Sequence, residues 1–194
     1  MRELVFATHN QHKAQEVAEM LRPSGIIVQS LNDIGIHDEI VEDGTTMTEN
    51  AWIKANYIYN KFGCNVLSDD SGIEVDALNG APGLYSARYA GPQKDSDDNI
   101  NKLLREMKGI QNRSAQFRAV MALWINGTQK TFEGIVRGKI AMERIGTEGF
   151  GYDPIFIPEG YDTSFGVLSA EIKNTISHRA RALEQVKGFL SSLK

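Results

Sequence analysis

The sequence predicts an α/β protein in which a mixed central sheet is flanked by helices. Three observations predict this class: a strand–helix–strand order near the start, a two-residue hairpin signal near the middle and a helical pattern near the end. The 194 residues contain no internal repeat, no low-complexity segment and no linker rich in Pro, Gly or Ser. We therefore expect one domain over residues 1–194.

The first elements alternate between strand and helix. Residues 4–7 predict a short buried strand, and apolar residues at helical spacing over 14–21 predict a helix that Pro23 closes. Residues 26–28 predict the second strand.

A longer helix and a third strand follow. Residues 46–62 predict the helix, and Thr46 and Glu49 match a capping box at its start. Residues 66–67 then predict a short strand that ends in a polar turn over 68–72.

The second half of the chain predicts a helix, a hairpin and a last helix. Apolar spacing over 100–107 predicts a helix after an Asp-rich first turn, and residues 117–123 alternate as in a half-buried strand. Asn126-Gly127 is a strong hairpin signal, with residues 131–140 as the returning strand. The last helix is predicted from Ser177 to about residue 190.

Composition excludes several classes of protein. Hydrophobic residues make up 41% and charged residues 24%, which is typical of a globular protein, and the net charge of −4 offers no broad field for nucleic acid. No apolar stretch is long enough to span a bilayer, so we expect neither a nucleic-acid nor a membrane partner. Cys64 is the single cysteine and rules out an intrachain disulfide, which favours a cytoplasmic location.

A polar segment between the first strand and the first helix is a candidate anion site. Free N–H groups at a helix start attract phosphate, and Lys13 places a cation where the helix dipole disfavours it. Asn10 as a simple helix cap and Lys13 as a solvated side chain remain the alternative. The candidate residues are Thr8, His9, Asn10, Gln11, His12 and Lys13.

Carboxylates gather in the middle of the sequence, at Glu42, Glu49, Asp69, Asp70, Glu74 and Asp76. Such groups repel one another unless a cation or proton compensates, and Mg²⁺ takes one or two carboxylates together with phosphate oxygens. Structural alternatives exist for four of them: Glu49 in the capping box, Asp69 holding the turn, and Glu74 and Asp76 on the solvent face of a strand.

Two further segments complete the candidate site. Ser177, His178 and Arg179 open the last helix, where a cation opposes the dipole, and Lys173 precedes them on a short polar segment. Phe150 lies between two glycines, which could present its ring to a planar base, although an ordinary turn with a core Phe would look the same.

Taken together and in order, these segments resemble the inosine triphosphate pyrophosphatase family of house-cleaning nucleotide pyrophosphatases. The resemblance covers nearly the whole chain and is highly specific because so many segments are in register. The matching segments are Thr8-x-Asn10-x-x-Lys13, residues 42–55 with Glu49-Asn50-Ala51 and Lys54, residues 68–72, residues 81–91, residues 149–154 and Ser177-His178-Arg179.

The resemblance implies an elongated two-lobed fold with an active-site cleft, a homodimer and dependence on Mg²⁺. It implies that residues 8–13 and Lys54 hold the triphosphate, that Glu42 and Asp70 bind the metal, and that Asp70 is also the general base. Ser71 would contact the substrate. The base would be framed by Phe150, Gly151, Tyr152, Asp153, Lys173, His178 and Arg179. His9 and Asp43 depart from residues common in the family, which puts only local detail in doubt.

The implied reaction is attack of water on the α-phosphorus of ITP, dITP or XTP, which releases pyrophosphate and keeps aberrant purines out of DNA and RNA. Donors from His178 and Arg179 would match the oxygen at purine position 6 and oppose the amino group of adenine. Three rivals remain: a pyrophosphatase for modified pyrimidine nucleotides, a phosphatase with an aspartyl nucleophile and a nucleotide sensor without turnover.

Overall fold

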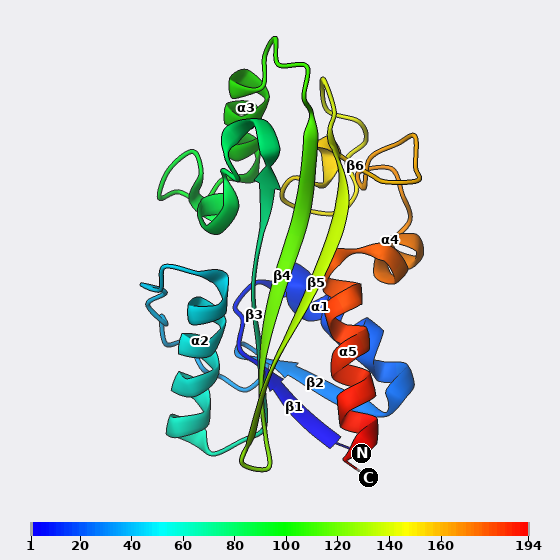
Figure 1. Ribbon diagram of the computed structural model, residues 1–194. Coiled ribbons are helices and arrows are strands. Elements are labelled where there is room, and N and C mark those ends of the chain that lie inside the picture. The colour runs from blue at the N-terminus through cyan, green and yellow to red at the C-terminus, as the bar shows by residue number, and fades with distance from the viewer. Residues whose placement is uncertain (1, 194) are drawn as a thin grey trace. The chain divides into compact units, whose positions relative to one another are not determined.

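The computed structural model describes residues 2–193 and contains a six-stranded sheet in the order β2-β1-β3-β4-β5-β6 (Figure 1). Strand β1 is parallel to β2 and β3, whereas β5 and β6 are antiparallel, so the predicted mixed sheet is confirmed. The strands are β1 Arg2–Phe6, β2 Ile26–Ser30, β3 Val66–Val75, β4 Ser114–Ile125, β5 Thr128–Ile140 and β6 Phe156–Pro158.

Five α-helices accompany the sheet in the described part of the chain: α1 Gln11–Leu21, α2 Met47–Phe62, α3 Ser96–Glu106, α4 Ala170–Ile176 and α5 His178–Ser192. Short 3₁₀ helices lie at η1 Arg22–Ser24, η2 Asp76–Leu78, η3 Gly83–Arg88 and η4 Asp153–Ile155. The predicted capping box is present, because Thr46 accepts from the Glu49 backbone and Glu49 reaches back to the backbone of Thr46. The predicted hairpin is also present, with positive φ at both Asn126 and Gly127.

The chain forms two compact units. Unit 1 comprises Met1–Asp70, Ala119–Gly134 and Arg179–Lys194, and unit 2 comprises Ser71–Arg118 and Ile135–His178. The expectation of one domain over the whole chain stays a prediction.

Unit 1 has an apolar core on each face of its part of the sheet. Leu4 and Phe6 of β1 pack with apolar residues of α1 and α5, whereas Val5 packs with apolar residues of α2. This alternation follows from the two-residue repeat of a strand. Figure 1 shows α1 and α5 on one side of the sheet and α2 on the other.

Unit 2 has a core of its own, built from rings and apolar residues of α3, β3, β4, β5 and the segment around β6. Phe117, Phe156 and Phe165 lie at its centre, and the centroids of the first two rings are 4.7 Å apart. The loop that carries Phe150 and the helix α4 that carries Lys173 belong to this unit.

One prediction of local structure is wrong. Residues 68–72 do not form a turn, because β3 continues through them to Val75. Their polar side chains find partners inside the protein: the Ser68 hydroxyl donates to the Ala51 carbonyl and Asp69 accepts from cations. Lys173, which the sequence placed on a short polar segment, lies on α4, with Ser169 as the N-cap of that seven-residue helix.

Candidate functional site

The segment 8–13 connects the end of β1 to the start of α1. Asn10 is the N-cap of α1, since its side-chain oxygen accepts from the Lys13 backbone N–H at 3.1 Å. The Asn10 N–H in turn donates to the Thr8 hydroxyl oxygen, while Gln11 and His12 are exposed in the first turn. The capping half of the alternative is thus confirmed, whereas its solvated Lys13 is wrong, because that side chain is 18% exposed and pairs with Asp69. Phosphate binding by the same helix start stays a prediction.

His9 fixes a neighbouring part of unit 1. Its ring nitrogens lie 3.1 Å from the Asn32 side-chain oxygen and 3.0 Å from the Asp38 carbonyl oxygen. The departure at His9 therefore gives this chain a side-chain link between segment 8–13 and the loop before α2.

Lys13, at the other end of the segment, belongs to a buried network of charges. Its ammonium lies 3.1 Å from an oxygen of Asp69, and the guanidinium of Arg179 lies 3.2 Å from the other oxygen. Arg179 also donates to Glu16 of α1 at 2.5 Å. Lys13 thus has an internal anion, and its place at the helix start does not by itself require an external one.

Burial and charge oppose each other in this network. Burial alone would raise the pKa of Asp69, but Lys13 and Arg179 outweigh it and hold that pKa well below its usual range. Burial lowers the pKa of Lys13, which Asp69 offsets in part. For Arg179, Asp69 and Glu16 outweigh burial and raise the pKa. Two cations and two carboxylates thus lie in contact, and their opposite charges offset the cost of burial.

The predicted metal carboxylates lie in one neighbourhood of unit 1. Glu42 is in the loop before α2, and Asp70 is in β3. Lys54 of α2 donates to Glu42 at 2.5 Å. Asn50, one turn earlier on α2, accepts from the Gly44 N–H at 2.9 Å and donates to Asp70 at 3.2 Å. Burial raises the pKa of Asp70, Lys54 opposes that shift, and the charge of Glu42 adds to it.

These residues fit a magnesium ion by their chemistry. Asn50 links the loop that carries Glu42 to Asp70, so two hard oxygen ligands lie in one half-buried neighbourhood, where a divalent cation would relieve their repulsion. Among residues 2–193 no group of three or more His, Cys, Asp or Glu side chains is arranged to hold a metal. Mg²⁺ needs no such cage, because it takes one or two carboxylates and completes its shell with water and phosphate oxygens.

In unit 2, Asp153 organises the predicted base-binding loop. Its carboxylate accepts from the Phe150 backbone N–H at 2.8 Å and from the Lys173 ammonium at 2.6 Å. Lys173 also lies over the Phe150 ring, 4.5 Å from its centroid. A buried ion pair thus holds one half-buried aromatic ring in place.

The other predicted members of unit 2 differ in exposure. Tyr152 is buried and donates its hydroxyl to the Ser86 carbonyl at 2.8 Å, whereas Gly151 is half-buried. The His178 ring stacks on Phe117 with centroids 4.8 Å apart and planes 12° apart. Ser71 is half-buried in β3. Tyr152 therefore braces the loop, while the Phe150 and His178 rings have defined orientations.

The sequence-predicted residues fall into two clusters. The charged cluster in unit 1 contains Lys13, Glu42, Lys54, Asp70 and Arg179; the aromatic cluster in unit 2 contains Phe150, Asp153, Lys173 and His178. Arg179 was expected to face the base, and its side chain is 1% exposed with two carboxylates of unit 1 as partners. Its contact with a base stays a prediction.

Sequence reasoning missed Glu16 and Phe117. Glu16 follows Lys13 by three residues on α1, so helical spacing could have placed both on one face. The alternating pattern assigned Phe117 to a strand. Nothing in the sequence pairs its ring with that of His178, which lies far along the chain on α5.

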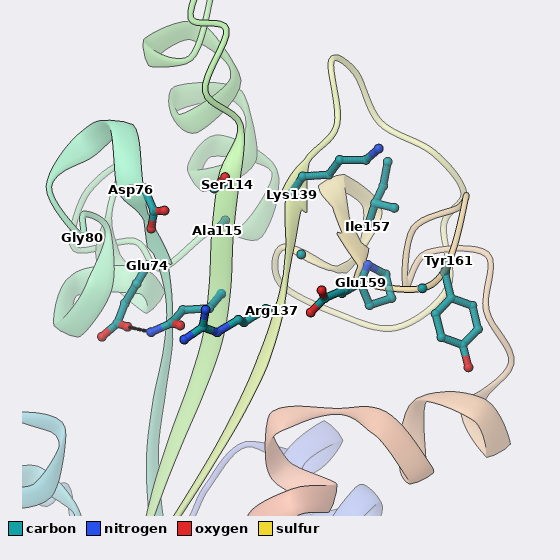
Figure 2. Close-up of a pocket in the computed structure, with 14 residues that line it drawn as sticks. Glu74, Asp76, Gly80, Ser114, Ala115, Arg137, Lys139, Ile157, Glu159 and Tyr161 are labelled. Carbon is teal, nitrogen blue, oxygen red and sulfur yellow. Dashed lines mark hydrogen bonds between the residues drawn. The ribbon is translucent and has the colours of Figure 1, made fainter.

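A pocket of about 680 Å³ in unit 2 contains none of the predicted site residues. It lies across β3, β4, β5 and the segment after β6, and its wall includes Glu74, Arg137, Lys139 and Glu159 (Figure 2). Glu74 accepts from Gln116 at 2.7 Å in this wall. Glu74 and Asp76 therefore line a pocket of unit 2, with Glu74 half-buried at the end of β3 and Asp76 exposed at the start of η2.

Comparison with known proteins agrees with the resemblance. The dITP/XTP pyrophosphatase of Flavobacterium johnsoniae is 49% identical to this chain over 191 residues, which cover 98% of this chain and 99% of the relative. The dITP/XTP pyrophosphatase of Bacillus subtilis is 48% identical over 195 residues, which cover 99% of this chain and 98% of the relative. The solved structure of the Staphylococcus aureus Ham1 protein superposes with a TM-score of 0.89 at 38% identity and covers 100% of both chains.

Within residues 2–193 no helix is both long and apolar enough to cross a membrane. The family model of the Ham1 family matches residues 4–189, nearly the full length of the sequence. The chain belongs to the Ham1 family.

Proposed function

We propose that this chain hydrolyses non-standard purine nucleoside triphosphates, namely dITP, ITP and XTP, to the monophosphate and pyrophosphate with Mg²⁺. The observation that carries the proposal is the charged cluster, in which Lys54 pairs with Glu42, Lys13 pairs with Asp69 and the neighbouring Asp70 accepts from Asn50. Cations for a triphosphate and carboxylates for a metal and a water are thereby supplied together. The names of the relatives support the choice of substrate.

In the proposed reaction a water attacks the α-phosphorus, and Asp70 takes its proton. A bond forms between the water oxygen and phosphorus, while the bond to the bridging oxygen of pyrophosphate breaks. Lys13 and Lys54 neutralise charge on the triphosphate and on the leaving pyrophosphate. When bound by Glu42 and Asp70, Mg²⁺ supplies further neutralisation of phosphate charge.

Burial prepares Asp70 for this role. A half-buried carboxylate is less well hydrated than an exposed one, and burial raises its pKa, so it is a stronger proton acceptor than an ordinary Asp. Asp69, by contrast, is held far from protonation by Lys13 and Arg179. The neighbouring carboxylates thus have different roles: Asp69 fixes cations, and Asp70 accepts the proton.

We assign base binding to the aromatic cluster. Phe150 offers a ring for stacking, and His178 offers a donor for the oxygen at purine position 6. Adenine carries an amino donor at that position, so the same His178 donor would oppose it. Arg179 would also donate to the base only if its side chain left one of its carboxylate partners, Glu16 or Asp69.

By resemblance to the family we further propose a homodimer that works in the cytoplasm and clears these nucleotides before DNA and RNA synthesis can use them. The single Cys64 is consistent with a reducing compartment.

The test is a panel assay of pyrophosphate and phosphate release from dITP, ITP, XTP, GTP, ATP and methylated UTP, with Mg²⁺ and with chelator. We expect pyrophosphate from the first three, much slower release from ATP, and loss of activity with chelator. Inorganic phosphate as the first product would indicate a phosphatase, preference for methylated UTP would indicate a pyrimidine enzyme, and binding without turnover would indicate a sensor.

A further inference from the structure

Asn50 is a buried amide to which the sequence assigned no function. It is 2% exposed and lies in the first turns of α2, directly after the capping-box Glu49. Its two polar atoms serve different parts of unit 1. The oxygen accepts from the N–H of Gly44, in the loop that carries Glu42, and the nitrogen donates to an oxygen of Asp70.

The orientation of this amide is fixed by its partner. A backbone N–H can only donate, so the atom that faces Gly44 at 2.9 Å must be the oxygen of Asn50. The NH₂ group must therefore face Asp70. Gly44 allows the approach, because a Cβ added there would lie 2.6 Å from the Asn50 oxygen.

We propose that Asn50 is a positioning residue for the reaction: by anchoring to Gly44 and donating to one oxygen of Asp70, it turns the other Asp70 oxygen toward the water and the metal. This inference rests on the proposed function. A carboxylate rotates easily about its last side-chain bond, and a donor on one oxygen restricts that rotation. The same amide ties the Asp70 position to the loop of Glu42, the other metal carboxylate.

Unit 2 contains a matched amide whose hydrogen-bond partners, within residues 2–193, are backbone groups. Asn99 is the fourth residue of α3, as Asn50 is of α2, and is 4% exposed. Its oxygen accepts from the Ala90 N–H at 2.6 Å and its nitrogen donates to the Ala87 carbonyl at 3.1 Å. Asn99 therefore anchors a loop and contacts no residue that is assigned a role in the reaction. It is the control for a purely structural role.

The experiment compares Asn50→Asp and Asn50→Leu with Asn99→Asp and Asn99→Leu. Asn50→Asp keeps an oxygen acceptor for Gly44 but loses the donor to Asp70, whereas Asn50→Leu keeps the branched shape and loses both polar atoms. Each variant is measured for melting temperature, for kcat with dITP and Mg²⁺, and for calorimetric binding of Mg²⁺ with an α,β-imido dITP analogue.

We expect both Asn50 variants to lower kcat by about 10- to 100-fold, since misplacement of a reacting group by about 1 Å can cost that much. Binding of the analogue should fall by less than kcat, because Lys13 and Lys54, which are proposed to bind the phosphates, are unchanged. Both Asn99 variants should lose stability without loss of kcat.

The inference is overturned if Asn50→Asp has the kcat of the wild type, because Asn50 would then only anchor the loop. It is also overturned if analogue binding falls as much as kcat, because the added charge or a distorted site would then explain the loss. An equal fall in kcat for Asn99→Asp would overturn it as well. A wild-type protein that releases no pyrophosphate from dITP would instead refute the proposed function, and analogue binding would still be measurable.

Discussion

Each unit of this protein contains a buried Lys–Asp pair, and the two pairs are surrounded very differently. Lys13 and Asp69 in unit 1 lie 3.1 Å apart and connect to further ions, namely Arg179 and Glu16. Lys173 and Asp153 in unit 2 lie 2.6 Å apart, and Lys173 has the rings of Phe150 and Phe165 within 6 Å.

The difference indicates two uses for the same pair. In unit 1, each ion controls the charge state of its neighbours, so a substitution there should change ionisation, stability and proton transfer. In unit 2, the pair fixes a backbone N–H and an aromatic ring, so a substitution there should change how well a flat ligand binds. The following predictions separate these two uses.

The largest effect is expected from Asp70→Asn, because an amide cannot accept the proton of water. We expect kcat for dITP to fall by about 100- to 10,000-fold, the range that general acid–base groups contribute. Steady-state release of pyrophosphate measures this, with a melting curve to show that the variant is folded. Asp76→Asn, an exposed carboxylate of unit 2, is the control and should retain wild-type kcat. A folded Asp70→Asn protein with near-normal turnover would remove Asp70 from the mechanism.

The next effect concerns stability. Asp69→Asn leaves the half-buried Lys13 and the buried Arg179 with one carboxylate fewer, and we expect the free energy of unfolding to fall by about 3–5 kcal/mol. Asp153→Asn should cost less, since an amide oxygen can still accept from the Phe150 N–H. Denaturant unfolding at neutral pH measures both. An equal loss in the two variants would contradict the contrast between the units.

The same Asp69 variant has a definite pH dependence. The folded pKa of Asp69 lies below its ordinary value of 3.8, so its carboxylate stabilises the fold above that value. That contribution is lost as the pH falls from about 4 toward the folded pKa. The stability gap between wild type and Asp69→Asn should therefore be widest at neutral pH and narrow below about pH 4. A gap that widens in acid would mean that Asp69 is not ionised in the fold.

The sequence predicted the sheet, most helices and the identity of the charged residues, because these follow from local periodicity and composition. The capping box at Thr46 and the hairpin at Asn126 each depend on neighbouring residues alone. Residues 68–72 show where local reasoning fails: Ser, Asp and Gly favour turns, yet β3 continues because Asp69 meets cations from α1 and α5.

Contacts between distant residues explain the rest of the difference. The sequence shows that Arg179 lies in the first turn of a helix, where the dipole disfavours a cation. Its partners Glu16 and Asp69 could not be identified in this way, because they are distant in sequence. Asn50 appeared only as a residue between Glu49 and Ala51, and its link from Gly44 to Asp70 depends on how α2 packs. Side-chain partners across elements are set by packing, which one sequence does not encode locally.

The smallest predicted effect tests the aromatic side of the comparison. Lys173→Met keeps the length of the side chain but removes the charge over Phe150 and the donor to Asp153. We expect KM for dITP to rise by about 10-fold with kcat nearly unchanged, since a desolvated cation–π contact contributes up to about 2 kcal/mol. Lys102→Met is the matched control, because Lys102 lies 4.2 Å from the Tyr89 ring in the same unit. If Lys173→Met instead lowers kcat at unchanged KM, the pair acts on the chemical step, and the division between an ionic unit 1 and a ring-holding unit 2 fails.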